Sequence, residues 1–73
     1  MVRKLSTYYA DDESGSYCEV HFNFKDECAF LEYYDNSGKK FFHEEFPNKS
    51  LVYVENAAEN WALGIKKIET LYG

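Results

Sequence analysis

Residues 17–24 read Tyr-Cys-Glu-Val-His-Phe-Asn-Phe, and the apolar side chains of this stretch alternate with polar ones. Because a strand turns successive side chains to opposite faces of a sheet, a period of two predicts a strand with one buried and one exposed face. This stretch decides the fold, since turn signals on both sides of it divide the neighbouring sequence into further strands.

Two turns with the same signature flank this region. Residues 12–15 (Asp-Glu-Ser-Gly) and 35–38 (Asp-Asn-Ser-Gly) both begin with Asp and end with Gly, which is the residue preference of a type I turn. A third reversal is expected at Lys25-Asp26, before the aromatic run that follows. The three turns separate four strands, which we expect over residues 3–11, 16–24, 27–34 and 39–46.

Beyond the fourth strand the sequence takes on a helical period. Pro47 cannot donate to a strand ladder and is expected to end the strand, and either Asn48 or Ser50 can cap a helix. Apolar residues then recur every three or four positions: Leu51, Val54, Ala58, Trp61, Ile65, Ile68 and Tyr72. This spacing predicts an amphipathic helix of about six turns. A competing interpretation makes residues 51–54 a fifth short strand and begins the helix near Glu55.

Together these elements predict an α+β fold of the order ββββα. The expected architecture is a four-stranded antiparallel meander sheet with one C-terminal amphipathic helix packed on one face. We expect residues 1–73 to form a single domain, because a chain this short does not support two hydrophobic cores.

The turns also predict which side chains share a face of the sheet. The pairs expected beside the turns are Asp11 with Ser16, Phe24 with Glu27, and Tyr34 with Lys39. In this register one face is almost entirely apolar and consists of Leu5, Thr7, Tyr9, Cys18, Val20, Phe22, Phe24, Ala29, Leu31, Tyr33, Phe42 and Phe46. We expect the helix to cover this face, because an exposed apolar patch of that size would promote aggregation.

The opposite face mixes aromatic rings with charged groups. It is expected to hold Tyr8, Tyr17, Glu19, His21, Asn23, Phe30, Glu32, Tyr34, Lys39, Phe41, His43 and Glu45. Tyrosine among polar neighbours is typical of a recognition surface, although cross-strand aromatic pairs also stabilise a small sheet without any partner. The leading hypothesis is a protein-binding module, whose partner is another protein or a second copy of the chain. The residues predicted to bind it are Tyr8, Tyr17, His21, Phe30, Tyr34, Phe41 and His43.

The histidines and cysteines do not predict a metal or catalytic site. His21 and His43 share a row but flank the third strand, roughly 10 Å apart, which is too far for both to reach one zinc ion. Cys18 and Cys28 are expected on opposite faces. The sequence contains no glycine-rich phosphate loop and no nucleophile beside a histidine. We therefore expect no enzyme, no cofactor and no metal, with either histidine at most a pH-sensitive contact.

Composition narrows the class of partner. The 73 residues include 13 acidic and 8 basic side chains, a net charge of -5. Duplex nucleic acid is bound mainly through clustered Lys and Arg, so no duplex is expected as partner. The apolar runs fall far short of the ~20 residues that cross a bilayer, and no signal-peptide core follows Met1. We expect a cytoplasmic protein without membrane contact.

Two other classes of function stay open. One is nucleic-acid related: a sheet whose rings stack single-stranded bases, or an acidic mimic of the duplex. The other is a structural subunit of a larger assembly, which would lack a discrete binding hot spot.

Residues 50–66 read Ser-Leu-Val-Tyr-Val-Glu-Asn-Ala-Ala-Glu-Asn-Trp-Ala-Leu-Gly-Ile-Lys. This segment resembles the C-terminal part of small uncharacterised accessory proteins of tailed phages that infect marine cyanobacteria. The resemblance implies a viral accessory protein expressed in a bacterial cytoplasm. Under the leading hypothesis of a protein-binding module, a host enzyme or complex is a candidate partner. The resemblance implies no activity and no functional residues.

Overall fold

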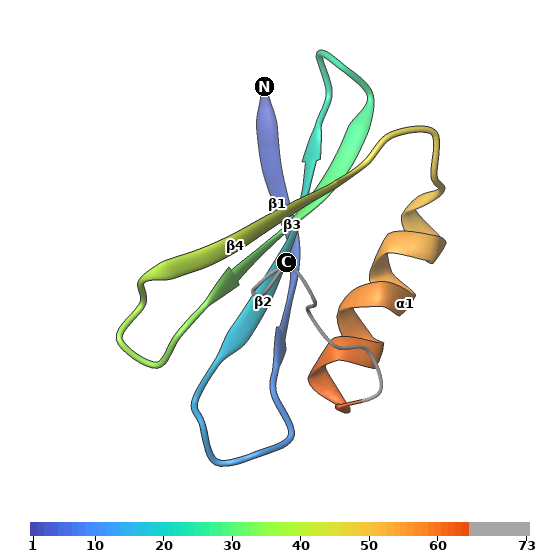
Figure 1. The fold of residues 1–73 in the computed structure, drawn as a ribbon. Helices are drawn as coiled ribbons and strands as arrows, with labels where there is room; N and C mark the ends of the chain where they lie inside the picture. The colour runs from blue at the N-terminus through green and yellow to red at the C-terminus, as the bar shows by residue number, and fades with distance from the viewer. Residues whose placement is uncertain (65–73) are drawn as a thin grey trace, which may run out of the picture.

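The strands and the helix follow one another as the sequence predicts. A computed structural model describes residues 1–64. Its elements are β1 (Val2–Tyr9), β2 (Tyr17–Asn23), β3 (Cys28–Tyr34), β4 (Lys40–Phe46) and α1 (Leu51–Ala62). The strands form one antiparallel sheet in chain order, and Figure 1 shows this twisted sheet with α1 running beside it. The predicted ββββα fold is confirmed.

The core lies between α1 and the two central strands. Alternate residues of these strands are fully buried, as the period of two requires: Cys18 and Val20 in β2, and Ala29, Leu31 and Tyr33 in β3. The helix contributes Val54, Ala57 and Ala58 to the same cluster. The predicted apolar face of β2 and β3 is therefore the face that the helix covers.

The helix begins where a serine can cap it. The Ser50 hydroxyl accepts a hydrogen bond from the Tyr53 amide at 3.1 Å, which satisfies one of the amides that the first helical turn leaves without a partner. Residues 51–54 are thus the first turn of α1, and the alternative of a fifth strand is wrong.

The helix is also shorter than predicted. It ends at Ala62, where the Leu63 amide bonds to the Glu59 carbonyl at 2.9 Å and the Gly64 amide bonds to the Trp61 carbonyl at 3.0 Å. Bonds of this kind close the last turn ahead of a glycine. The apolar positions predicted to continue the stripe, Ile65, Ile68 and Tyr72, lie outside the described residues. Between residues 1 and 64, no helix has both the length and the apolar character needed to cross a bilayer.

The pairing of β2 with β3 matches the predicted register. Tyr17 lies opposite Tyr34, and Asn23 ends the ladder at the other side. The Asn23 side-chain oxygen accepts hydrogen bonds from the amides of Lys25 at 3.0 Å and Asp26 at 3.3 Å. An asparagine that bonds its own backbone a few residues onward stabilises a tight turn, so the Lys25-Asp26 reversal is confirmed.

The first hairpin differs from the prediction by one residue. The prediction pairs Ser16 with Asp11, but the Ser16 carbonyl accepts its hydrogen bond from the Ala10 amide, at 2.9 Å. The loop therefore holds one residue more than expected. Asp12 stabilises it by accepting a hydrogen bond from the Ser14 amide at 2.9 Å. A slip of one residue turns the side chains of a strand to the other face.

The slip corrects the predicted faces of β1. Tyr8 lies opposite Cys18 and turns toward the helix, while Tyr9 lies opposite Tyr17 on the other face. Thr7 lies on the same face as Tyr9, because it is two residues away on the same strand. The predictions are therefore wrong for Tyr8, Thr7 and Tyr9. Leu5 falls at a bulge between Lys4 and Ser6 and is 39% exposed.

The third hairpin is shifted by two residues, which leaves the predicted faces of most of β4 unchanged. Glu32 lies opposite His43, whereas the prediction pairs Glu32 with Phe41. Because side chains alternate with a period of two, an even shift moves His43 along its face without turning it over.

A bulge at Phe41 takes up the irregularity. Its neighbours Lys40 and Phe42 lie opposite Tyr34 and Tyr33, so Phe41 has no partner in the ladder. Its ring contacts Tyr33, with 6.3 Å between ring centroids, and Tyr33 belongs to the core under the helix. The predicted placement of Phe41 on the opposite face is therefore wrong, because a bulge re-aims the side chain that it carries.

Candidate functional site

The face of the sheet that turns away from α1 is the candidate site, and we call it the open face. Residues opposite one another in a ladder share a face, so the pairings define its members. They are Val2, Lys4, Thr7, Tyr9, Tyr17, Glu19, His21, Asn23, Cys28, Phe30, Glu32, Tyr34, Lys40, His43 and Glu45. No element among residues 1–64 packs on this side in Figure 1.

A row of three tyrosines crosses one end of the open face. The rings of Tyr17 and Tyr34 are stacked, with centroids 5.0 Å apart and planes 11° from parallel. Tyr9 continues the row at 5.6 Å from Tyr17, and its side chain is the most exposed of the three, with 69% of the residue accessible. The three rings therefore form a continuous aromatic row across β1, β2 and β3.

Next to this row, two glutamates stand opposite each other. Glu19 of β2 pairs with Glu32 of β3, an arrangement of like charges that is unfavourable by itself. Lysines on the two outer strands offset it: Lys4 Nζ lies 3.6 Å from Glu19 Oε2, and Lys40 Nζ lies 3.1 Å from Glu32 Oε2. Each glutamate therefore has one carboxylate oxygen close to a lysine on an edge strand of the sheet.

His21 lies between the remaining carboxylate oxygens. Its Nε2 atom is 3.0 Å from Glu19 Oε1 and 3.5 Å from Glu32 Oε1. We call Glu19, His21 and Glu32 the Glu-His-Glu cluster. Their side chains are only 17%, 14% and 16% exposed, so the cluster is largely shielded from water although it lies on an open face.

The electrostatics of the cluster keep Glu32 ionised. Burial by itself raises the pKa of this carboxyl group, but hydrogen bonds from the Tyr34 hydroxyl at 2.8 Å and from Lys40 at 3.1 Å outweigh burial and hold the pKa below its ordinary value. The same bond raises the pKa of Tyr34, because an ionised tyrosine would lose the proton that it donates. The tyrosine row and the cluster are therefore chemically linked.

An imidazole lies on either side of Phe30. The rings of His21 and Phe30 are stacked at 5.1 Å, and His43 contacts Phe30 from the next strand at 5.0 Å. His43 also approaches two carboxylates, Glu32 Oε2 at 3.6 Å and Glu45 Oε2 at 3.3 Å. Beside these rings is a hollow of about 440 Å³, to which Cys28 contributes.

The structure brings most of the predicted site residues together. Those that lie on the open face as predicted are Tyr17, His21, Phe30, Tyr34 and His43. Tyr8 and Phe41 do not, for the reasons given above. Tyr9 replaces Tyr8 in the row, and Lys40 replaces Lys39. In both cases two identical residues stand next to each other in the sequence. The change of register therefore replaces one residue of the open face with another of the same type.

The Glu-His-Glu cluster is the feature that the sequence analysis missed. The relevant signal is Glu19 and His21 two residues apart on one strand, with Glu32 on the adjacent strand. The predicted β2–β3 register is correct and already places Glu32 opposite Glu19. The distance between the two histidines does not reveal this cluster, because its other two side chains are carboxylates.

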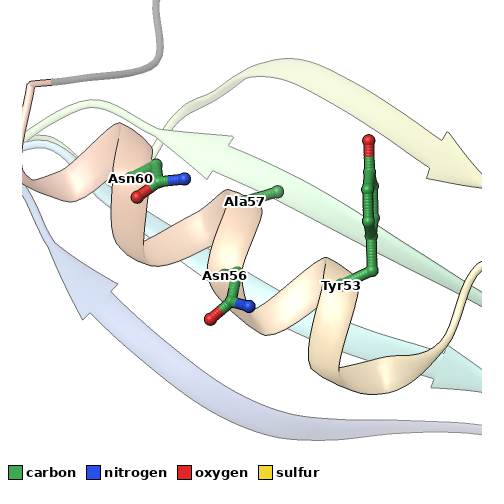
Figure 2. A pocket seen from close by; sticks show the side chains of 4 residues that line it. All are labelled: Tyr53, Asn56, Ala57 and Asn60. Atoms are coloured by element: carbon green, nitrogen blue, oxygen red, sulfur yellow. The ribbon is translucent and has the colours of Figure 1, made fainter.

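A second hollow lies on the helix. It has a volume of about 360 Å³ and is lined by Tyr53, Asn56, Ala57 and Asn60, which come from successive turns of α1, as Figure 2 shows. Tyr53 also packs edge-on against Phe46, with centroids 5.9 Å apart. Its lining residues all belong to α1, and none of them is part of the open face.

No protein-family model, curated protein or solved structure matches this chain. The chemistry of the open face is therefore the basis on which a function is proposed.

Proposed function

We propose that this chain is a small acidic protein-binding module that binds a partner protein through the open face of its sheet. The observation that carries the proposal is the row of Tyr9, Tyr17 and Tyr34 on a face that α1 does not cover. Tyrosine is enriched among residues that dominate binding energy, because it adds apolar area and a hydroxyl group while losing little conformational entropy.

The mixture of rings and charges favours a reversible complex with another protein over a permanent dimer. Obligate homodimer interfaces are more apolar and resemble a divided core. Here the tyrosine row borders Glu32 and Lys40, which already form an ion pair at 3.1 Å. Such a surface resembles a non-obligate interface, where aromatic anchors sit among polar groups. In view of the resemblance of residues 50–66, we propose a host protein as the partner and a viral accessory role for this chain.

The tyrosine geometry gives less support to binding of single-stranded nucleic acid. Bases stack on ring faces, but Tyr17 and Tyr34 stack on each other, so one face of each ring is already occupied. The cations that border the site, Lys4 and Lys40, are paired with glutamates and do not form a continuous basic groove. A protein partner is therefore the proposal that the open face supports better.

The proposal is tested by placing a charge on the tyrosine row. We expect Tyr9→Glu to remain folded, because Tyr9 is mostly exposed, and to abolish capture of the partner from a lysate of the native host. Val52→Glu is the matched control: Val52 is 70% exposed on the helix, so the variant carries the same added charge away from the open face and should capture the partner as the wild type does.

Sedimentation velocity separates the two kinds of partner. A wild-type chain that stays monomeric over a wide concentration range supports a different protein as the partner. A concentration-dependent dimer that Tyr9→Glu converts to a monomer would show self-association instead. If the same protein is captured by the wild type and by Tyr9→Glu with equal yield, the open face is not the binding surface.

A further inference from the structure

The Glu-His-Glu cluster lies beside the tyrosine row, and its geometry is more specific than a surface ion pair requires. One ligand atom from each of Glu19, His21 and Glu32 lies within 4.8 Å of the other two. All three residues come from the central strands β2 and β3. Sites on such elements are held more accurately than sites on loops.

The two distances from His21 to the carboxylates are close to the separation of ligand atoms around a small metal ion, and all three ligand atoms lie within 4.8 Å of one another. Zinc binds imidazole nitrogen and carboxylate oxygen at about 2.0 to 2.2 Å in tetrahedral geometry, which places neighbouring ligand atoms about 3.3 Å apart. His21 Nε2 lies 3.0 Å from Glu19 Oε1 and 3.5 Å from Glu32 Oε1. A small rearrangement of the side chains would therefore bring these atoms around one ion.

Residues around the cluster fix the orientation of its side chains, as residues around a metal site fix the orientation of the metal ligands. Lys4 and Lys40 lie beside the Oε2 atoms of Glu19 and Glu32, and the Oε1 atoms face His21. The Tyr34 hydroxyl also donates a hydrogen bond to Glu32 Oε1 at 2.8 Å. Hydrogen bonds to the ligands from a surrounding shell are a regular feature of metal sites, because they fix the ligands in place. The stacked ring of Phe30 restrains the His21 imidazole in addition.

Charge and ligand type indicate the class of ion. Two carboxylates balance a divalent cation, and an imidazole nitrogen favours zinc and related transition metals over magnesium and calcium, which prefer oxygen ligands. We propose that Glu19, His21 and Glu32 form a binding site for a divalent transition-metal ion of the zinc type. Three protein ligands leave one coordination position open on this face of the sheet.

Calorimetric titration of the full chain with zinc chloride tests the site. The titration uses the Cys28→Ser background, so that a partly exposed thiol cannot account for binding. We expect one zinc ion to bind per chain in this background, and magnesium not to compete. His21→Gln and Glu32→Gln should each weaken zinc binding by at least about tenfold, since even loss of an outer-shell group costs that much.

Glu45→Gln is the matched control. Glu45 is an exposed carboxylate of the open face that pairs with His43, and it does not belong to the cluster. The control should bind zinc as tightly as the background. Absence of zinc binding in the background, or a loss in the control equal to the loss in His21→Gln, would overturn the proposal.

A second measurement leaves the cluster unsubstituted, so it tests the site even if a variant does not fold. Nitrogen NMR of the imidazoles should show zinc shifting the Nε2 resonance of His21 while the resonances of His43 change little. If zinc shifts His43 alone, or neither histidine, the site does not exist. The result is independent of partner capture, so the metal site and the proposed binding function stand or fall separately.

Discussion

The hydroxyl group of Tyr8 donates a hydrogen bond to the carboxylate of Glu55, and this bond joins the first strand to the helix. Ser6 donates to the other oxygen of Glu55 at 2.9 Å. Both donors reach the helix only because β1 is shifted by one residue from its predicted register. The shift supplies a partly buried carboxylate with two hydroxyl partners, which satisfies its hydrogen-bonding capacity.

Glu55→Ala should lower the free energy of unfolding by about 2 kcal/mol, because two partly buried hydroxyl groups lose their acceptor. Urea denaturation measures the change. Glu59→Ala is the matched control, since Glu59 lies one turn later and is exposed, and it should change stability by no more than about 0.5 kcal/mol. Equal losses in both variants would contradict the role of the Tyr8 contact.

Tyr8 should titrate late. The hydrogen bond to Glu55, followed by burial, raises its pKa to about 12, above the ordinary value of about 10. Since the folded state favours the protonated form, the stabilisation is complete below about pH 10 and is lost as the pH rises through 12. Ultraviolet titration of tyrosinate should show a late transition that Tyr8→Phe removes. Ionisation of Tyr8 near pH 10 in the folded protein would refute this expectation.

Glu32 should contribute to stability at neutral pH and lose that contribution in acid. Although burial opposes it, hydrogen bonds from Tyr34 and Lys40 lower the pKa of Glu32. The contribution is therefore present above the ordinary carboxyl value of about 4.3 and is lost as the pH falls through the lower folded value.

Tyr34→Phe removes one of these bonds and tests the point. Its stability deficit relative to the wild type should be largest near pH 7 and should shrink as Glu32 is protonated. Tyr17→Phe, which alters the stacked partner of Tyr34 and leaves the Tyr34–Glu32 bond in place, should show the acid dependence of the wild type. A deficit for Tyr34→Phe that is constant with pH would rule out Glu32 as its origin.

Gly15→Ala should destabilise the fold more than Gly38→Ala. Both glycines have a positive φ, +78° and +86°, so both alanines carry a backbone cost of about 1 to 2 kcal/mol. A Cβ atom at residue 15 would also lie 2.7 Å from the Cβ of Asn36, whereas at residue 38 the nearest atom is the Tyr17 hydroxyl at 3.9 Å. Thermal unfolding compares them, and equal shifts of Tm would show that Gly15 and Asn36 do not pack together.

Much of the fold and part of the site follow from local pattern. The alternation in residues 17–24 and the Lys25-Asp26 reversal predict the pairing of β2 with β3 correctly, because side chains two residues apart share a face and a tight turn leaves little freedom in register. The opposition of Glu19 and Glu32 and the stacking of Tyr17 on Tyr34 depend on that register alone.

The register of the outer strands β1 and β4 could not be predicted as accurately, because two registers of each strand fit the sequence equally well. Either member of the Tyr8-Tyr9 doublet fits either face, and the same holds for Lys39-Lys40. A slip of β1 therefore leaves the aromatic character of both faces almost unchanged, and composition does not reveal it.

By itself, then, the sequence determined the order of the elements, the central register and the chemical character of the open face, since these depend on periodicity and on short turns. Only the tertiary structure decided which tyrosine faces the helix and how Glu19, His21 and Glu32 converge. Glu55, which accepts the hydrogen bond of Tyr8, lies 47 residues further along the chain. The ring of Phe41, at its bulge, contacts Tyr33 of the core. Contacts between residues so far apart depend on how the helix and sheet pack, and local pattern does not encode that packing.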